Sequence, residues 1–219
     1  MKNRFFSILN KFKKIAILIF LLTLFVFINA IGYVSAVSSN ISDSVFRLHV
    51  IANSNSEEDQ NLKYIVRDAI IKYVNSTYNV ESKNELINSI DLDTIKEIAQ
   101  NTIIENGFSY PVKVEIGNFS FPTKTYGDIA LPAGFYDALR IKIGNAEGKN
   151  WWCVMFPPLC FVDVSSGIVP DSSKEVLEDN LGDEEYNLIA DNSDTVKFKF
   201  KIVEFFQNIS MEIASLSGK

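Results

Sequence analysis

Residues 118–163 read NFSFPTKTYGDIALPAGFYDALRIKIGNAEGKNWWCVMFPPLCFVD. Over residues 139–143, apolar side chains alternate with Arg140 and Lys142, which predicts a strand with one buried face. After a turn comes a second expected strand, residues 151–156, which is apolar on both faces, and we interpret the two as a hairpin. Both faces of the second strand must be covered, which favours a central strand beneath a helix layer. The alternative is an exposed aromatic strip that docks a partner.

The N-terminus has the pattern of an export signal. Five basic residues and no acidic residue precede residue 37, and every residue from 15 to 28 except Thr23 is apolar. Val34, Ser35 and Ala36 place small residues at the positions that a signal peptidase recognises, which predicts cleavage after Ala36. The alternative is a retained membrane anchor over residues 15–37, which is about long enough to cross a bilayer. In both cases the basic head stays in the cytoplasm and the rest of the chain lies outside.

Charge is distributed unevenly along the chain. Once the five basic residues of the N-terminus are set aside, 16 basic residues remain against 27 acidic ones, a net charge of about −11. This balance argues against a nucleic acid or an anionic membrane face as partner, since both attract clustered lysine and arginine. We therefore expect membrane contact only through the N-terminal segment. The predicted organisation is a signal peptide or anchor (residues 1–36), a polar linker (37–44) and one domain (45–219).

Hydrophobic periodicity predicts the order of elements in that domain. Ser56 and Asp59 form an N-terminal cap signature ahead of an apolar helical stripe over residues 62–74. A second helical region, residues 83–105, is expected to divide near Asp93, which would cap its second part, and to stop at Asn106 and Gly107. The other expected elements are a strand at 45–52, a strand at 112–116 extending towards 121, one or two helical turns within 172–186, and a strand running into a helix at 195–216. The predicted class is α+β, a mainly antiparallel sheet with helices packed on one face.

Cysteines and histidine are few. Cys153 and Cys160 are the only cysteines, and a pair seven residues apart in an exported domain predicts a disulfide. Pro157 and Pro158 between them break the strand, so that the chain can turn back; two buried free thiols are the alternative. No metal site is expected, because one histidine and two cysteines do not fill a zinc site. His49 lies within the first expected strand, where a structural role is favoured over general-base catalysis.

Motifs of catalysis are absent from the sequence. It contains no phosphate-binding glycine loop, no HExxH, no calcium loop and no nucleophile elbow. We therefore expect a protein that is not an enzyme and has no cofactor. One alternative is an exported hydrolase acting at the cell wall with Cys153 or Cys160 and His49. Another is a wall-binding module that keeps its N-terminal anchor.

Two segments resemble the stage II sporulation protein R family of endospore-forming bacteria. They are RLHVIANSNSEEDQNLKYIVRDAI (residues 47–70) and FPTKTYGDIALPAGFYDALRIKIGNAEGKNWWCVMFPPLCFVD (residues 121–163). The resemblance implies a signalling protein made in the forespore and secreted into the space between the two membranes of the sporangium. There it would trigger a membrane-embedded aspartic protease of the mother-cell membrane, which processes the sigma-E precursor.

A docking surface for that protease is expected in residues 121–134 and 151–161, where loops meet the end of the aromatic strand. The candidate contact residues are Phe121, Pro122, Lys124, Tyr126, Gly127, Leu131, Pro132, Gly134, Trp152, Pro157 and Pro158. In this interpretation Trp151 and Cys153 belong to the core that positions them.

Overall fold

The computed structural model describes residues 2–160 and 169–190. The chain divides into two compact units, Met1–Ser39 and Asn40–Lys219. The long helix α1 spans Lys2–Ser44, so the residues expected as a polar linker are its last helical turns. Within it, Phe12–Asn29 has a mean hydropathy of 2.1 and no buried residue, and is long and apolar enough to cross a membrane. A signal sequence and a membrane anchor both have this composition.

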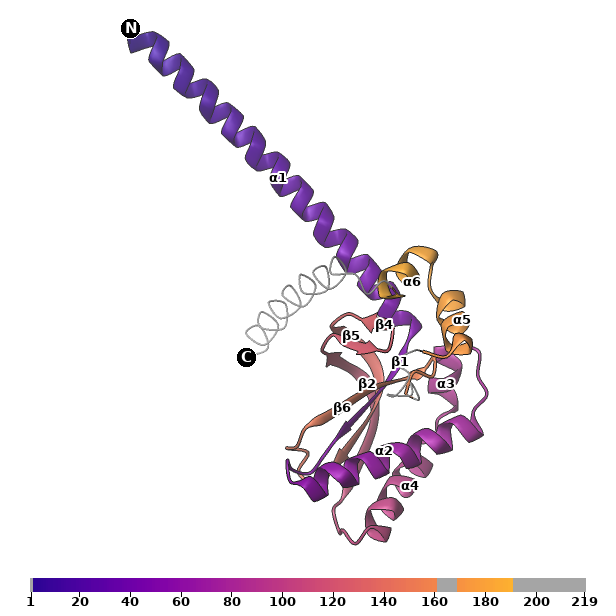
Figure 1. Ribbon diagram of the computed structural model, residues 1–219. Helices are drawn as coiled ribbons and strands as arrows, with labels where there is room; N and C mark the ends of the chain where they lie inside the picture. The colour runs from indigo at the N-terminus through magenta and orange to yellow at the C-terminus, as the bar shows by residue number, and fades with distance from the viewer. Residues whose placement is uncertain (1, 161–168, 191–219) are drawn as a thin grey trace. The chain divides into compact units, whose positions relative to one another are not determined.

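Four strands form the main sheet in the order β2-β5-β1-β6 (Figure 1). In chain order they are β1 (Phe46–Ile51), β2 (Val112–Phe121), β5 (Gly134–Ile143) and β6 (Asn150–Phe156). β5 pairs antiparallel with β2 and parallel with β1, and β1 pairs antiparallel with β6. Most of the pairing is antiparallel and helices accompany the sheet, so the predicted α+β class is confirmed.

The predicted hairpin of residues 139–143 with 151–156 is wrong, because β1 lies between β5 and β6. Leu48 of β1 is opposite Leu139 on one side and opposite Cys153 on the other. The connection between β5 and β6 passes the end of β1, where the Gly148 N–H donates to the Ala52 carbonyl at 2.9 Å. A strand that is buried on both faces is best placed in the middle of a sheet, and β1 occupies that position.

The helices α2 (Glu57–Thr77), α3 (Lys83–Ser89) and α4 (Leu92–Glu105) follow β1. The predicted cap of α2 is confirmed, since the Asp59 N–H donates to Ser56 Oγ at 3.2 Å. The division of the second helical region is confirmed as well, but its cap is Asp91 rather than Asp93. Asp91 Oδ1 accepts the Asp93 N–H at 3.0 Å, because a cap residue must precede the first helical turn. Gly107, with φ +84°, follows the end of α4 as predicted.

The helix layer covers one face of the sheet. α2 and α4 lie side by side across it (Figure 1). Their buried side chains share one hydrophobic core with the strand residues that face them, among them Leu62, Val66, Ile70, Ile95, Leu48, Val50, Leu139, Ile141, Cys153 and Met155. The prediction that the aromatic strand packs beneath a helix layer is therefore confirmed, but its predicted central position is wrong, because β6 is an edge strand and β1 lies between it and β5.

A second, two-stranded sheet made of β3 (Lys124–Tyr126) and β4 (Ile129–Leu131) contacts the other face through Tyr126. Gly127, with φ +58°, permits the tight turn between its strands. Two helices, α5 (Asp171–Asn180) and α6 (Asp183–Ala190), account for the helical turns expected in residues 172–186, and α6 contacts β4. The expected strand and helix at 195–216 lie outside the described residues.

Candidate docking site

The candidate contact residues differ in exposure. Phe121, Leu131, Pro132, Gly134 and Pro157 are buried, whereas Pro122, Lys124, Tyr126, Gly127 and Trp152 are partly exposed and Pro158 is exposed. Buried side chains can support a docking surface but cannot touch a partner without rearrangement. The accessible candidates on and beside the β3–β4 hairpin are therefore the ones that matter. We call Pro122, Lys124, Tyr126, Gly127 and Trp152 the hairpin surface.

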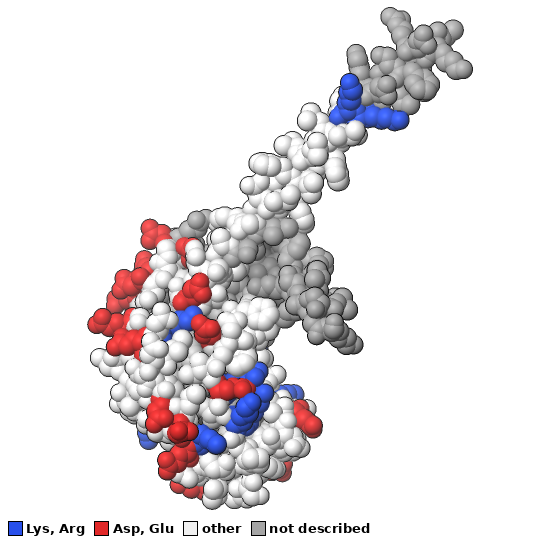
Figure 2. Space-filling view, turned by 180° about the vertical axis from the view of Figure 1, so that it is seen from behind, with Lys and Arg blue, Asp and Glu red and all other residues white. Residues whose placement is uncertain are grey.

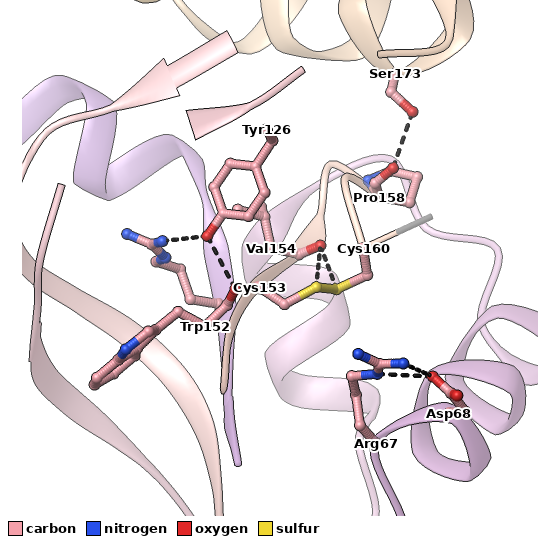
Figure 3. Close-up of a disulfide and its surroundings, with 10 residues drawn as sticks. Arg67, Asp68, Tyr126, Trp152, Cys153, Val154, Pro158, Cys160 and Ser173 are labelled. Atoms are coloured by element: carbon pink, nitrogen blue, oxygen red, sulfur yellow. Dashed lines mark hydrogen bonds and ion pairs between the residues drawn. A yellow bond between two sulfur atoms is a disulfide. The ribbon is translucent and has the colours of Figure 1, made fainter. Parts of the chain in front are cut away.

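Tyr126 fastens the β3–β4 hairpin to the main sheet. Its hydroxyl accepts a hydrogen bond from Arg47 Nη2 at 2.6 Å and donates one to the Trp152 carbonyl at 3.2 Å (Figure 3). Burial raises the pKa of Tyr126, so the hydroxyl keeps its proton at neutral pH and can make both bonds. The Trp152 carbonyl belongs to the edge strand β6, so this contact also shields part of the sheet edge.

Arg47 lies at the centre of the site, and the sequence analysis did not single it out. Its guanidinium is fully buried, 4.2 Å from the ring centre of Phe121 and 4.7 Å from that of Tyr136. Among the described residues no carboxylate forms an ion pair with it, and its Nε and Nη1 have no hydrogen-bond partner. Cation–π contacts contribute about 2 kcal/mol each when desolvated. Burying a charge costs several kcal/mol, and each unmet donor adds about 1 to 3 kcal/mol, so the cage of rings does not offset the full cost.

His49 is two residues along the same strand and on the same face. Its ring stacks on Trp152, with 3.8 Å between ring centres, and its Nε2 lies 2.8 Å from Asn150 Oδ1. Because an amide oxygen accepts, we assign the ring proton to Nε2. Burial, aided by the nearby Arg140 and Lys142 cations, lowers the pKa of His49 to about 4. The imidazole is neutral at pH 7 and positions Trp152.

Acid should destabilise the protein through His49. The unfolded chain binds a proton near pH 6.5 but the folded one only near pH 4, so stability falls as pH drops through this window. Between pH 7.5 and pH 5 the loss attributable to His49 should be about 2 kcal/mol. Urea denaturation of wild type and His49→Gln at both pH values measures it. An equal loss in the two proteins would mean that His49 is solvated in the native state.

Cys153 and Cys160 are joined by a disulfide, with their Cα atoms 5.4 Å apart (Figure 3). Cys153 points into the helix-side core, because it is opposite Leu48 in the sheet, whereas His49 is opposite Trp152 on the other face. The structure therefore does not form the cysteine–histidine pair that an exported hydrolase would need. The disulfide ties the end of β6 to the loop that follows it.

Removal of the disulfide should cost stability without changing the fold. The bond closes a loop between residues seven positions apart, and closure of so short a loop contributes about 2 to 3 kcal/mol in the chain-entropy model. Cys160→Ser should lower the free energy of unfolding by this amount, measured by urea denaturation. Dithiothreitol should produce a similar loss in the wild type and none in the variant. A wild-type protein that is insensitive to dithiothreitol would contradict this.

The hairpin turn is held from outside by α5. Asp128 Oδ2 pairs with Lys174 Nζ at 2.5 Å, and Asp128 Oδ1 accepts the Val169 N–H at 3.1 Å. Burial alone would raise the pKa of Asp128, but the hydrogen bonds from Lys174 and Val169 outweigh it and lower the pKa. Asp128 is therefore ionised at neutral pH, and the ion pair holds the turn.

Among residues 2–160 and 169–190, no group of three or more His, Cys, Asp or Glu side chains could hold a metal ion. Figure 2 shows acidic side chains spread over the visible face of the Asn40–Lys219 unit, with basic ones in small groups beside them. The site is thus an aromatic and hydrogen-bonded cluster on an acidic domain.

Comparison with known proteins identifies the family of this chain. A family profile for stage II sporulation protein R matches residues 42–166, which include Arg47, His49 and the whole hairpin surface. The chain is a member of the stage II sporulation protein R family. It is 38% identical over 186 residues to the stage II sporulation protein R of Bacillus subtilis (strain 168), covering 77% of this chain and 83% of that protein. No solved structure matches this chain.

Proposed function

We propose that this protein is an exported signal that triggers the membrane-embedded aspartic protease of the sigma-E pathway. Membership of the family carries the proposal, since it assigns the chain to sporulation signalling. The N-terminal apolar helix supports export, because Phe12–Asn29 follows a basic head and can engage a membrane. A domain on the far side of that membrane can reach a protease whose external part faces the same space.

The hairpin surface is the part of the domain that we propose touches the protease. Trp152 is a partly exposed aromatic residue held by stacking on His49, and Tyr126, also partly exposed, donates a hydrogen bond to its carbonyl. Aromatic residues are common anchors in protein interfaces. Lys124 adds a cation on an otherwise acidic domain. The opposite face of the sheet is covered by α2 and α4 and is less suited to a partner.

Reconstitution in a bacterium that does not sporulate tests the proposal. Co-expression of this protein with the protease and the sigma-E precursor should yield the shortened sigma factor on an immunoblot, and omission of this protein should prevent cleavage. A form lacking residues 2–36 should remain in the cytoplasm and fail to trigger cleavage. Equal cleavage without this protein would refute the proposal.

Intact mass of the exported protein separates a cleaved signal from a retained anchor. A mass that begins at Val37 means that residues 1–36 of the chain, with most of α1, are removed and the domain diffuses freely. A full-length mass means that the domain remains at the membrane, as a wall-binding module would. Cross-linking to the protease, with and without reductant, then reports whether contact is direct and whether the disulfide matters for it.

A further inference from the structure

The buried guanidinium of Arg47 lacks the partner that its charge requires. Two of its nitrogens, Nε and Nη1, have no acceptor, and only Nη2 is hydrogen bonded, to the neutral Tyr126 hydroxyl. None of the described carboxylates lies within ion-pair distance of it, although the domain is rich in acidic residues. Buried charges in proteins are almost always paired, so a buried guanidinium with two free donors is a candidate binding site for an anion.

The arrangement of the free donors of Arg47 favours a carboxylate as the group that would bind them. Phe121 and Tyr136 contact the guanidinium as cation–π partners and hold it, so that its free N–H groups keep a fixed direction. A planar fork of donors matches the two oxygens of a carboxylate. A water molecule could accept the hydrogen bonds but would leave the positive charge of Arg47 uncompensated. A carboxylate accepts the hydrogen bonds and also compensates the charge.

The β3–β4 hairpin is the element that could admit such a group. Its strands have three residues each and pair only with one another, so displacing it breaks no bond of the main sheet. It is held by the hydrogen bonds of the Tyr126 hydroxyl, by the ion pair of Asp128 with Lys174, and by the buried side chains of Ile129 and Leu131 on β4. Because Arg47 is fully buried, the hairpin must move before a ligand can reach it.

We propose that Arg47 is the receptor for a carboxylate group and that the β3–β4 hairpin is the cover over it. The carboxylate is either a free small anion or an aspartate or glutamate side chain of a docking protein. This site is additional to the proposed trigger function and does not depend on it. It is tested on the full-length chain alone, so its failure leaves the trigger proposal standing.

Thermal unfolding of the full-length chain in detergent micelles, in sodium acetate or sodium chloride at equal ionic strength, is the test. Acetate should raise the Tm of the wild type saturably, by about 3 to 6 °C at ten times its half-saturating concentration. Arg47→Met should abolish the acetate effect. Arg67→Met is the matched control and should retain the acetate effect. Arg67 also lies over a ring, with its guanidinium 4.3 Å from the ring centre of Trp151, but it already pairs with Asp68 at 2.7 Å. An equal shift in chloride, or an undiminished shift in Arg47→Met, would overturn the proposal.

Two further arms cover a variant that does not fold and identify the source of the carboxylate. Tyr126→Phe removes the hydroxyl that holds the hairpin on the sheet, and should lower the half-saturating acetate concentration severalfold. An unchanged or higher concentration would count against the hairpin as the cover of the site. A blocked tripeptide Ala-Glu-Ala should stabilise the wild type at lower concentration than acetate if the site takes a protein side chain, with Ala-Gln-Ala inactive. If acetate raises the Tm but the glutamate tripeptide does not, the carboxylate that the site binds is a free small anion. No saturable response of the wild type to either carboxylate overturns the proposal without any variant.

Discussion

Ile141→Ala should lower the free energy of unfolding by about 3 to 4 kcal/mol, a large part of the stability of a domain of this size. Ile141 is fully buried in the middle of β5, an interior strand, opposite Val50 of β1 and Val114 of β2. The substitution removes three carbons and leaves a cavity beneath the helix layer, which rigid neighbours on two strands cannot fill. Urea denaturation of the full-length chain in detergent, followed by circular dichroism, measures the loss.

Ile104→Ala is the matched control. Ile104 lies on α4 and its side chain is 58% exposed, so truncation removes little buried area and should cost less than about 0.5 kcal/mol. Comparable losses in the two variants would mean that the helix layer does not pack on β5 as the structure has it. A small loss in Ile141→Ala alone would mean that the sheet is looser than the burial of its centre implies.

The sequence predicted the elements of this fold better than their order. Periodicity predicted the strands around Leu48 and Leu139 because it indicates which face of a strand is buried. It does not record which strands are neighbours. Arg47 and His49 alternate with apolar residues in β1, which is the pattern of a half-exposed strand, yet β1 occupies the interior of the sheet and both side chains are buried. The insertion of β1 between β5 and β6 was therefore out of reach of local pattern.

The candidate site was predicted in part for the same reason. The stretch that holds Tyr126 and Trp152 was recognisable from its aromatic residues and turns. Arg47 was not, because its surroundings come from Phe121, Tyr126 and Tyr136, which are more than 70 residues away in the chain. The one available signal in the sequence was a charged residue within a predicted strand and flanked on both sides by apolar residues. Burial of five of the predicted contact residues likewise depends on tertiary packing that no spacing reveals.

The two faces of the sheet differ in how they are covered. On one face, helices of 21 and 14 residues bury a continuous apolar core. On the other, a hairpin with strands of three residues buries Ile129 and Leu131 and contacts Arg47 and the Trp152 carbonyl through the Tyr126 hydroxyl. A short hairpin adds fewer residues to the core than the long helices do, and such elements open at lower free energy. The face with Arg47 is therefore better suited than the helix-covered face to change shape when a partner binds.

Trp152→Ala should reduce triggering of precursor cleavage by about 10- to 100-fold at equal protein level. The indole is partly exposed beside the hairpin, and truncation of a tryptophan anchor in an interface typically costs about 2 kcal/mol or more. Its ring also stacks on His49 and contacts Phe121 at 4.7 Å, so some loss of stability is expected as well. Circular dichroism and Tm establish that the variant is folded, and immunoblots over a range of expression levels give the dose that triggers cleavage.

Tyr64→Ala separates a specific contact from a general loss of exposed aromatic surface. Tyr64 is 37% exposed and lies on α2, on the helix-covered side of the sheet, opposite to the side that Trp152 faces. It should trigger cleavage at the wild-type dose. If Trp152→Ala is folded and also works at that dose, the hairpin surface does not make the contact. If both variants fail equally to trigger cleavage, the loss of triggering follows from reduced stability. The contact must then be sought with substitutions at Lys124, which lies on the same hairpin and whose side chain is not part of the core.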